Sequence, residues 1–258
     1  MKLNKLEEAS NSKLPFSRIL LKLSGEALQD KSGASFLSAK TIERIVLEII
    51  PAIASGLQVA IVVGGGNLFR GETLSQTGIG RISADQMGML GTIINAMALR
   101  DIFEKNGQVA RVMSSIPMSG VVDHYDRRKA LHHLNAHRVV IFAGGTGNPL
   151  VTTDSAASLR AIEVEADLLA KASNVDGIYD SDPHLPGDHH RYETVSYKEA
   201  VIRELKVMDL GAFCQCRDHN LPIRVFNINE PGAISRLLNG ESEGTLVFNE
   251  EGELNVKL

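Results

Sequence analysis

Residues 59–66 read VAIVVGGG, five apolar and mostly β-branched residues followed directly by three glycines. Two more segments repeat this design: residues 19–25 read ILLKLSG, and residues 139–147 read VVIFAGGTG. Between residues 25 and 59, the apolar residues of 42–50 recur at the i, i+3, i+4, i+7 spacing of a helix. Buried strands that alternate with helices are typical of a parallel, helix-covered sheet. The sequence therefore predicts an α/β fold, a three-layer α-β-α sandwich with a mainly parallel central sheet.

The glycine-rich strand ends also predict where a ligand binds. In open α/β sheets, ligands bind beyond the carboxyl ends of the strands, which is where all three glycine clusters fall. The rest of the pattern predicts further elements: helices over 87–103, 156–169, 197–210 and 231–238, strands over 222–228 and 244–247, and a loop over 182–195.

Composition excludes several classes of protein. Of the 258 residues, 43% are hydrophobic and 22% are charged, the balance of a folded globular chain. The 27 basic and 31 acidic residues give a formal net charge of −4 without a basic run, which disfavours nucleic acid as the main partner. We find no run of about 18 apolar residues, the length that a membrane-spanning helix needs.

The two ends of the chain and its cysteines bear on organisation. Residues 1–16 lack the apolar segment of a secretory signal and predict a flexible N-terminal tail. We expect residues 17–258 to form a single domain, with an N-terminal half that ends near residue 165 and a C-terminal half after it. Cys214 and Cys216 are too close together for an ordinary disulfide and lack CxxC spacing, so we expect a reducing, cytoplasmic compartment.

Familiar catalytic and cofactor motifs are absent from the sequence or incomplete. The P-loop signature and the protein kinase motifs do not occur. Residues 64–69, GGGNLF, begin like a dinucleotide fingerprint, but Phe69 stands where the last glycine belongs. His133 and His137 have i, i+4 spacing without the HExxH pattern, so we expect no metal site built from protein residues.

Four charged residues suit phosphate chemistry, and three of them lie near the glycine clusters. Lys22 and Lys171 each interrupt an apolar run, and a buried ammonium needs either a carboxylate partner or an anionic ligand. Asp154 opens a predicted helix, where it is a cap, a partner of these lysines, or both. Arg70 follows the glycines of 64–66, as a phosphate clamp or as a surface residue. Fixed cations beside free backbone amides indicate phosphoryl transfer.

Seven blocks in order give the chain a family resemblance. They are KLSGEAL (22–28), VGGGNLFRG (63–71), DQMGML (85–90), GTGNPLVTTDSAASLRAIEVEAD (145–167), KASNVDGIYDSDP (171–183), KVMDL (206–210) and RDHNLPIRVFN (217–227). With these blocks, residues 17–247 resemble the bacterial-type UMP kinases of the amino acid kinase superfamily. The GTGNP…TTD block discriminates best, because relatives that act on carbamate, glutamate or aspartate share the glycine loops but not this block.

The resemblance implies an amino acid kinase-like fold and a reaction. The enzyme would transfer the γ-phosphoryl of ATP to UMP by direct in-line transfer, giving UDP and ADP for pyrimidine nucleotide biosynthesis. Mg²⁺ would arrive with ATP rather than occupy a protein cage. The N-terminal half would bind UMP and the C-terminal half ATP. The resemblance also implies a homohexamer with GTP and UTP as effectors.

The same resemblance assigns roles by motif position. The catalytic group would be Lys22, Lys171, Asp154 and Asp209, the two aspartates organising the lysines. ATP would be bound by Lys22, Leu23, Ser24, Gly25, Gly66, Arg70, Ser173, Asn174, Tyr179 and Asp182. UMP would be bound by Gly65, Asp85, Thr146, Gly147, Asn148, Pro149, Leu150, Val151, Thr152 and Thr153. Candidates for a GTP effector site are Arg100, Arg111 and Arg138.

One segment departs from the pattern of the family, and three other functions stay open. Residues 30–38 read DKSGASFLS where members that respond to GTP often carry a glycine-phenylalanine-glycine stretch. The alternatives are another kinase of the superfamily, a nucleotide-sensing binding module, and a dinucleotide-dependent oxidoreductase. Paired lysines argue against the sensor, and the missing third glycine argues against the oxidoreductase.

Overall fold

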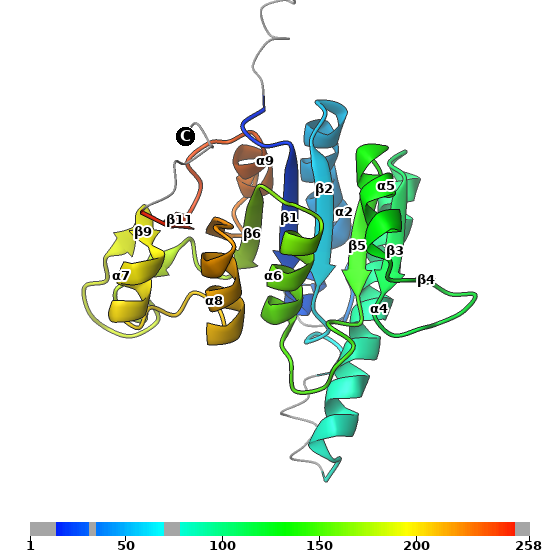
Figure 1. Ribbon diagram of the computed structural model, residues 1–258, viewed down its shortest axis with the longest axis horizontal. Coiled ribbons are helices and arrows are strands. Elements are labelled where there is room, and N and C mark those ends of the chain that lie inside the picture. Colours follow the sequence, from blue (N-terminus) through cyan, green and yellow to red (C-terminus); the bar gives the residue numbers. More distant parts are fainter. Residues whose placement is uncertain (1–13, 31–34, 70–77, 251–258) are drawn as a thin grey trace, which may run out of the picture.

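The computed structural model describes residues 14–30, 35–69 and 78–250, and in this part of the chain nine strands form one sheet (Figure 1). Their order across the sheet is β4-β3-β5-β2-β1-β6-β10-β11-β9. All neighbours from β4 to β10 pair in parallel, whereas β11 runs antiparallel to β10 and parallel to β9. The strands are β1 (Arg18–Leu23), β2 (Gln58–Val63), β3 (Ala110–Ser114), β4 (Asp123–His124), β5 (Val139–Ala143), β6 (Leu168–Ser173), β9 (Thr194–Ser196), β10 (Ile223–Asn227) and β11 (Thr245–Phe248).

Helices cover both faces of this sheet, so the predicted three-layer α/β sandwich with a mainly parallel sheet is confirmed. One apolar core lies between the sheet and α2 (Ala39–Ala54), α4 (Arg81–Lys105) and α9 (Ala233–Leu238). A second core lies on the other face, under α5 (Arg127–Asn135), α6 (Thr153–Glu163), α7 (Tyr197–Ile202) and α8 (Leu210–Asp218). Figure 1 shows α5, α6 and α8 in front of the sheet, with α2 and α9 behind it.

Strand alternation decides which face each side chain joins. In β1, Ile19, Leu21 and Leu23 belong to the first core, and Leu20 belongs to the second. Lys22 has the same parity as Leu20, since successive side chains of a strand point to opposite faces. The lysine therefore points toward the layer of α6 and α8.

The folded part of the chain already includes the last residues assigned to the tail. Phe16 is only 7% exposed, and Leu14 packs against the first core. Residues 1–13 lie outside the described residues, so the flexible tail stays a prediction there. None of the helices in the described part of the chain combines the length and apolar character that crossing a bilayer requires.

Three predicted element boundaries were wrong. The helix predicted over 156–169 is α6, which ends at Glu163, and β6 begins at Leu168. The helix predicted over 197–210 is α7, which ends at Ile202. The predicted loop over 182–195 contains β8 (Arg191–Tyr192), which pairs with β7 (Ile178–Tyr179), and the start of β9. In the first two, the chain reverses at Glu165 and Glu204, which adopt left-handed backbone conformations.

Candidate functional site

Two lysines lie side by side at the centre of the sheet. The parallel pairing of β1 and β6 sets Lys22 opposite Lys171. Both side chains point toward the layer of α6 and α8, because residue parity is the same in both strands. They are 12% and 17% exposed, so two ammonium groups share one small, partly buried space. Such a pair needs a counter-charge.

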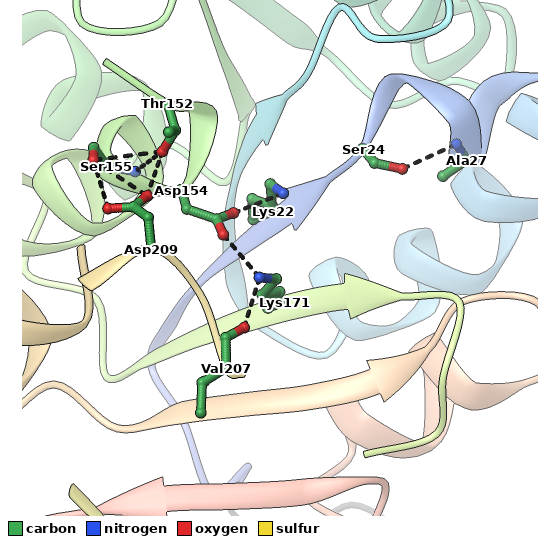
Figure 2. A network of polar contacts seen from close by, with 9 residues as sticks. All are labelled: Lys22, Ser24, Ala27, Thr152, Asp154, Ser155, Lys171, Val207 and Asp209. Atoms are coloured by element: carbon green, nitrogen blue, oxygen red, sulfur yellow. Dashed lines mark hydrogen bonds and ion pairs between the residues drawn. The ribbon is translucent and has the colours of Figure 1, made fainter. Parts of the chain in front are cut away.

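Asp154 supplies that counter-charge from the first turn of α6. Its Oδ1 lies 2.7 Å from the Lys22 Nζ, and its Oδ2 accepts a hydrogen bond of 2.8 Å from the Lys171 Nζ (Figure 2). Lys171 also donates to the carbonyl oxygen of Val207 at 2.7 Å. From the residues alone, Asp154 was a cap, a partner of the lysines, or both. The structure makes it the partner, because Thr152 caps α6 by accepting from the Ser155 amide.

The charges of this cluster perturb its titration. Burial opposes ionisation of Asp154, but the two ammonium groups outweigh it and hold the pKa of its carboxyl below the usual value. Burial lowers the pKa of Lys171, and repulsion from Lys22 acts in the same direction against the attraction of Asp154. One carboxylate between two lysines leaves a surplus of positive charge, which suits an anionic phosphoryl group.

Asp209 contacts residues on either side of Asp154, the partner of the two lysines. It caps α8 by accepting from the Ala212 amide at 3.0 Å. It also accepts from the Ser155 hydroxyl at 3.2 Å and from the hydroxyl of Thr152 (Figure 2). The carboxylate therefore ties the start of α8 to the start of α6, and so supports the turn that carries Asp154.

A pocket of 280 Å³ lies between β2, the first turns of α4 and the β5–α6 loop. It brings together most of the residues predicted to bind UMP: Gly65, Asp85, Asn148, Leu150, Val151, Thr152 and Thr153. Thr146, Gly147 and Pro149 belong to the same β5–α6 loop. Gly66, predicted on the ATP side, also lines this pocket. The pocket reaches the lysine cluster through Thr153, the neighbour of Asp154.

Asp85 is held by two partners inside this pocket. Arg81, one turn earlier in α4, donates to its carboxylate at 2.9 Å. The amide of Leu150 donates to the other oxygen at 2.9 Å. Leu150 adopts a left-handed conformation with φ of 67°, uncommon for a residue with a side chain. Asp85 therefore fixes the β5–α6 loop as well as facing the pocket.

A second pocket, of 310 Å³, lies on the other side of the lysine cluster, around the β6–β7 turn and the α7–α8 connection. Tyr179 and Asp182, both predicted to contact adenosine, line it. Ser173 and Asn174 lie at the end of β6, next to the lining residue Val175. The pocket extends to Lys206, the neighbour of the Val207 carbonyl that binds Lys171.

Glycines allow the loops above the cluster to pack closely. A Cβ on Gly25 would lie 2.9 Å from the carbonyl oxygen of Gly64, and one on Gly65 would lie 2.3 Å from that of Gly88. Both are closer than real Cβ contacts, so these positions require glycine for packing. Two residues before Gly25, Leu23 is buried, and its carbonyl oxygen accepts from the Gly64 amide. Ser24 caps the 3₁₀ helix η2 (Gly25–Leu28), and Arg70 lies outside the described residues.

Comparison with known proteins now adds a family. The model of the amino acid kinase family matches residues 17–227, most of the chain. The chain belongs to the amino acid kinase family. The superfamily stated from the seven sequence blocks is thereby confirmed, and relatives named uridylate kinase confirm the resemblance itself.

Within this family the chain has relatives that it matches over nearly its full length. It is 55% identical to the uridylate kinase of Coxiella burnetii, over 90% of this chain and 95% of the relative. It is 51% identical to the uridylate kinase of Pseudomonas fluorescens, over 96% and 99%. The crystal structure of the UMP kinase from Bacillus anthracis superposes with a TM-score of 0.87 at 43% identity, covering 92% of this chain and 97% of that one.

Two of the three arginines predicted to bind an effector lie together in this amino acid kinase. Arg100 and Arg111 line a separate pocket of 470 Å³, where Arg111 pairs with Glu104 at 3.1 Å. Arg138 contacts the His133 Nδ1 at 3.1 Å. Burial lowers the pKa of His133, and the charges of Arg138 and Arg111 add to the effect. The effector role stays a prediction.

Sequence reasoning missed a buried amide pair beneath the glycine loops. Asn67 and Asn95 donate to each other's oxygens at 3.0 and 2.7 Å. Each side-chain amide also donates to a backbone carbonyl oxygen at 2.7 Å: Asn67 to that of Phe36 and Asn95 to that of Gly64. Asn67 carried a signal in the sequence, because it directly follows three consecutive glycines, which need a contact that fixes their conformation. Asn95 carried no such signal, because only the fold brings α4 to the loop.

The described residues contain no group of three or more His, Cys, Asp or Glu side chains that could hold a metal ion. Asp154 is already paired with two lysines, and Asp209 accepts from two hydroxyl groups and one amide.

Proposed function

We propose that this chain is a UMP kinase, which transfers the γ-phosphoryl of ATP to UMP and produces UDP and ADP. The observation that carries the proposal is the cluster of Lys22, Lys171 and Asp154 between two pockets. One pocket contains the residues that match the UMP-binding motifs, and the other contains residues that match the adenosine-binding motifs. Relatives with 51–55% identity over most of the chain bear the name uridylate kinase.

In this proposal the protein positions and neutralises, and it moves no proton. A UMP phosphate oxygen, already ionised, forms the new bond to the γ-phosphorus. The bond from that phosphorus to the β,γ-bridging oxygen breaks, and ADP keeps the electron pair. Lys22 and Lys171 neutralise the negative charge on the transferring group, while Asp154 keeps the two ammonium groups together. Mg²⁺ that arrives with ATP would supply further charge neutralisation.

The same two pockets support a division of the domain into two halves. The UMP pocket draws its residues from the chain before residue 165, and the ATP pocket from the chain after it. We propose these halves as the acceptor-binding and donor-binding parts of one domain. The β1–β6 pairing joins them, because it carries one lysine from each half.

The reaction is tested by measuring ADP release in the presence of ATP, Mg²⁺ and one of five acceptors: UMP, CMP, carbamate, glutamate or aspartate. We expect turnover with UMP to exceed that with every other acceptor. Activity confined to carbamate or an amino acid would refute the assignment in favour of another kinase of the family. Binding of UMP without any turnover would favour a nucleotide sensor.

Regulation and assembly are proposed on the resemblance to bacterial-type UMP kinases. The chain would form a homohexamer in the cytoplasm, with GTP and UTP as effectors. Arg100 and Arg111 line one pocket outside the catalytic cluster together with Asp101, Glu104 and Asp123, and the two arginines supply its positive charge. Light scattering gives the mass of the assembly, and activity at fixed substrate with added GTP or UTP gives the effect. An unchanged GTP response in Arg111→Ala would remove this pocket from the proposal.

A further inference from the structure

Arg160 lies next to the UMP pocket. It is a buried cation that takes no part in the proposed mechanism. Its side chain, in the last turn of α6, is 7% exposed. A buried guanidinium needs partners for its charge and its donors. Glu163 supplies the charge, with an oxygen 2.5 Å from Nη1. The ring of Tyr125 supplies a face, 3.5 Å from the guanidinium carbon, and the Tyr125 hydroxyl donates to the same Glu163 oxygen at 2.6 Å.

A second nitrogen of the Arg160 guanidinium sets the direction of a hydrogen-bond chain. Nη2 donates to the Ser115 hydroxyl at 2.8 Å. Arginine has no acceptor, so the Ser115 oxygen must accept here and its own hydrogen remains available. That hydrogen is donated to the carbonyl oxygen of Gly145 at 2.8 Å. The chain therefore runs from a buried ion pair to the backbone of a residue that lines the UMP pocket.

The Gly145 carbonyl belongs to a segment with an unusual backbone. Gly144, Gly145 and Gly147 all have positive φ, of 74°, 56° and 84°. Such a run has many accessible conformations, so fixing one of them requires contacts from outside the loop. Thr92 in α4 accepts from the Gly144 amide at 2.6 Å, and Ser115 holds the next carbonyl.

Helix α6 thus acts on both ends of the β5–α6 loop. The loop leads into the first turn of α6 with Thr152 and Asp154, beyond the carboxyl ends of the strands (Figure 1). Arg160 lies about two turns further along the helix, and long helical side chains point back toward the N-terminus. Its guanidinium therefore reaches the start of the same loop through Ser115.

We propose that Arg160 is a positioning residue for the acceptor nucleotide. Through Ser115 it fixes the Gly145 carbonyl, and with it the loop that forms the UMP pocket. This inference rests on the proposed function, because it takes UMP as the occupant of that pocket. It concerns binding of the acceptor alone, since the ATP pocket is lined by other segments.

The test compares steady-state constants for Ser115→Ala, Arg160→Lys and their double variant in the full chain. One lost neutral hydrogen bond corresponds to about a threefold to tenfold rise in the KM for UMP for Ser115→Ala. Loss of a charged hydrogen bond corresponds to a rise of at least about tenfold for Arg160→Lys. The KM for ATP should stay within about twofold of the wild type in both. The double variant should match Arg160→Lys alone, because both residues act along one chain of contacts.

Arg224→Lys is the matched control. Arg224 is likewise buried, in β10, and donates to the Glu243 carbonyl away from both nucleotide pockets. It should lose stability without any change in the KM for UMP. If Arg160→Lys fails to fold, Ser115→Ala still decides the question, because it removes only one hydroxyl group.

Equal rises in the KM for UMP and ATP, additive effects in the double variant, or the same change in Arg224→Lys would each overturn the proposal. A wild-type chain that does not phosphorylate UMP would overturn the proposed function and this inference together. A wild type active on UMP, with variants that keep its KM, would overturn the inference alone.

Discussion

Replacing Asp154 by Asn removes the charge that holds two lysines together. The variant keeps the size of the side chain, and Thr152 still caps α6, so the helix starts at the same residue. The two ammonium groups, each within 2.8 Å of the carboxylate in the wild type, are left to repel each other. We expect them to separate, which removes their joint position around the transferring phosphoryl group.

The size of the effect follows from burial. Removing one partner of a buried ion pair costs about 3–5 kcal/mol. The three side chains are 12–17% exposed, and water can enter once they separate, so we expect a loss of stability near the lower end, about 3 kcal/mol. The value of kcat should fall by more than about a hundredfold, which corresponds to about 2.7 kcal/mol of transition-state stabilisation.

The assay measures ADP release at saturating ATP and UMP, together with urea unfolding of the same preparations. The matched control is Glu48→Gln, which also exchanges a carboxylate for an amide. Glu48 pairs with Arg44 at 2.9 Å and is 14% exposed, the same fraction as Asp154, but it lies in α2 on the opposite face of the sheet. It should keep kcat within about twofold. A kcat for Asp154→Asn within about threefold of the wild type would refute the reasoning.

The pH dependence of stability gives a second readout of the same variant. Because the pKa of Asp154 is lowered on folding, its carboxylate stabilises the fold above the pKa of the unfolded chain, and this contribution is lost as the pH falls through the lowered value. The difference in the free energy of unfolding between the wild type and Asp154→Asn should therefore be constant near neutral pH. It should decrease in acid. A difference that widens in acid would contradict the assignment.

Three further outcomes are expected. Because burial lowers the pKa of Lys171, kcat/KM should fall on the alkaline side below the pH at which an ordinary lysine titrates, and a profile that stays flat to that pH would contradict this. Gly65→Ala should lower Tm by more than about 5 °C, since its Cβ would lie 2.3 Å from a carbonyl oxygen of α4, whereas Gly80→Ala, with no atom within 4 Å, should not. Burial raises the pKa of the Cys216 thiol to about 12, so iodoacetamide at neutral pH should modify Cys214 first by mass spectrometry, and equal labelling would count against it.

The sequence predicted the fold because its signal is periodic and local. Short, largely β-branched runs that end in glycine and alternate with segments of helical periodicity are typical of buried parallel strands, whose carboxyl ends lie at a common edge. What failed were the ends of elements. The apolar pattern of 156–169 is continuous, yet α6 stops at Glu163 and β6 starts at Leu168. The turn between them is fixed by Asp167, whose carboxylate accepts from the Ser17 and Arg18 amides, a contact 150 residues distant in sequence for Ser17.

The site was predictable where one residue type had to carry charge. Lys22 and Lys171 were candidate site residues because they interrupt apolar runs. The parallel register of β1 and β6 then sets them opposite each other. Arg160 gave no such signal. An arginine in an amphipathic helix is usually a surface residue, and only the packing of α6 against Tyr125 and Ser115 buries it. Long-range contacts of this kind cannot be read from spacing along the chain.

The most direct test of the central claim is a crystal structure with UMP and a non-hydrolysable ATP analogue bound together. The account predicts the γ-phosphoryl group within hydrogen-bond distance of the Nζ atoms of both Lys22 and Lys171, with the UMP phosphate in line on the side of the β5–α6 loop. Phosphates bound elsewhere, with the two lysines still engaged only by Asp154, would contradict it.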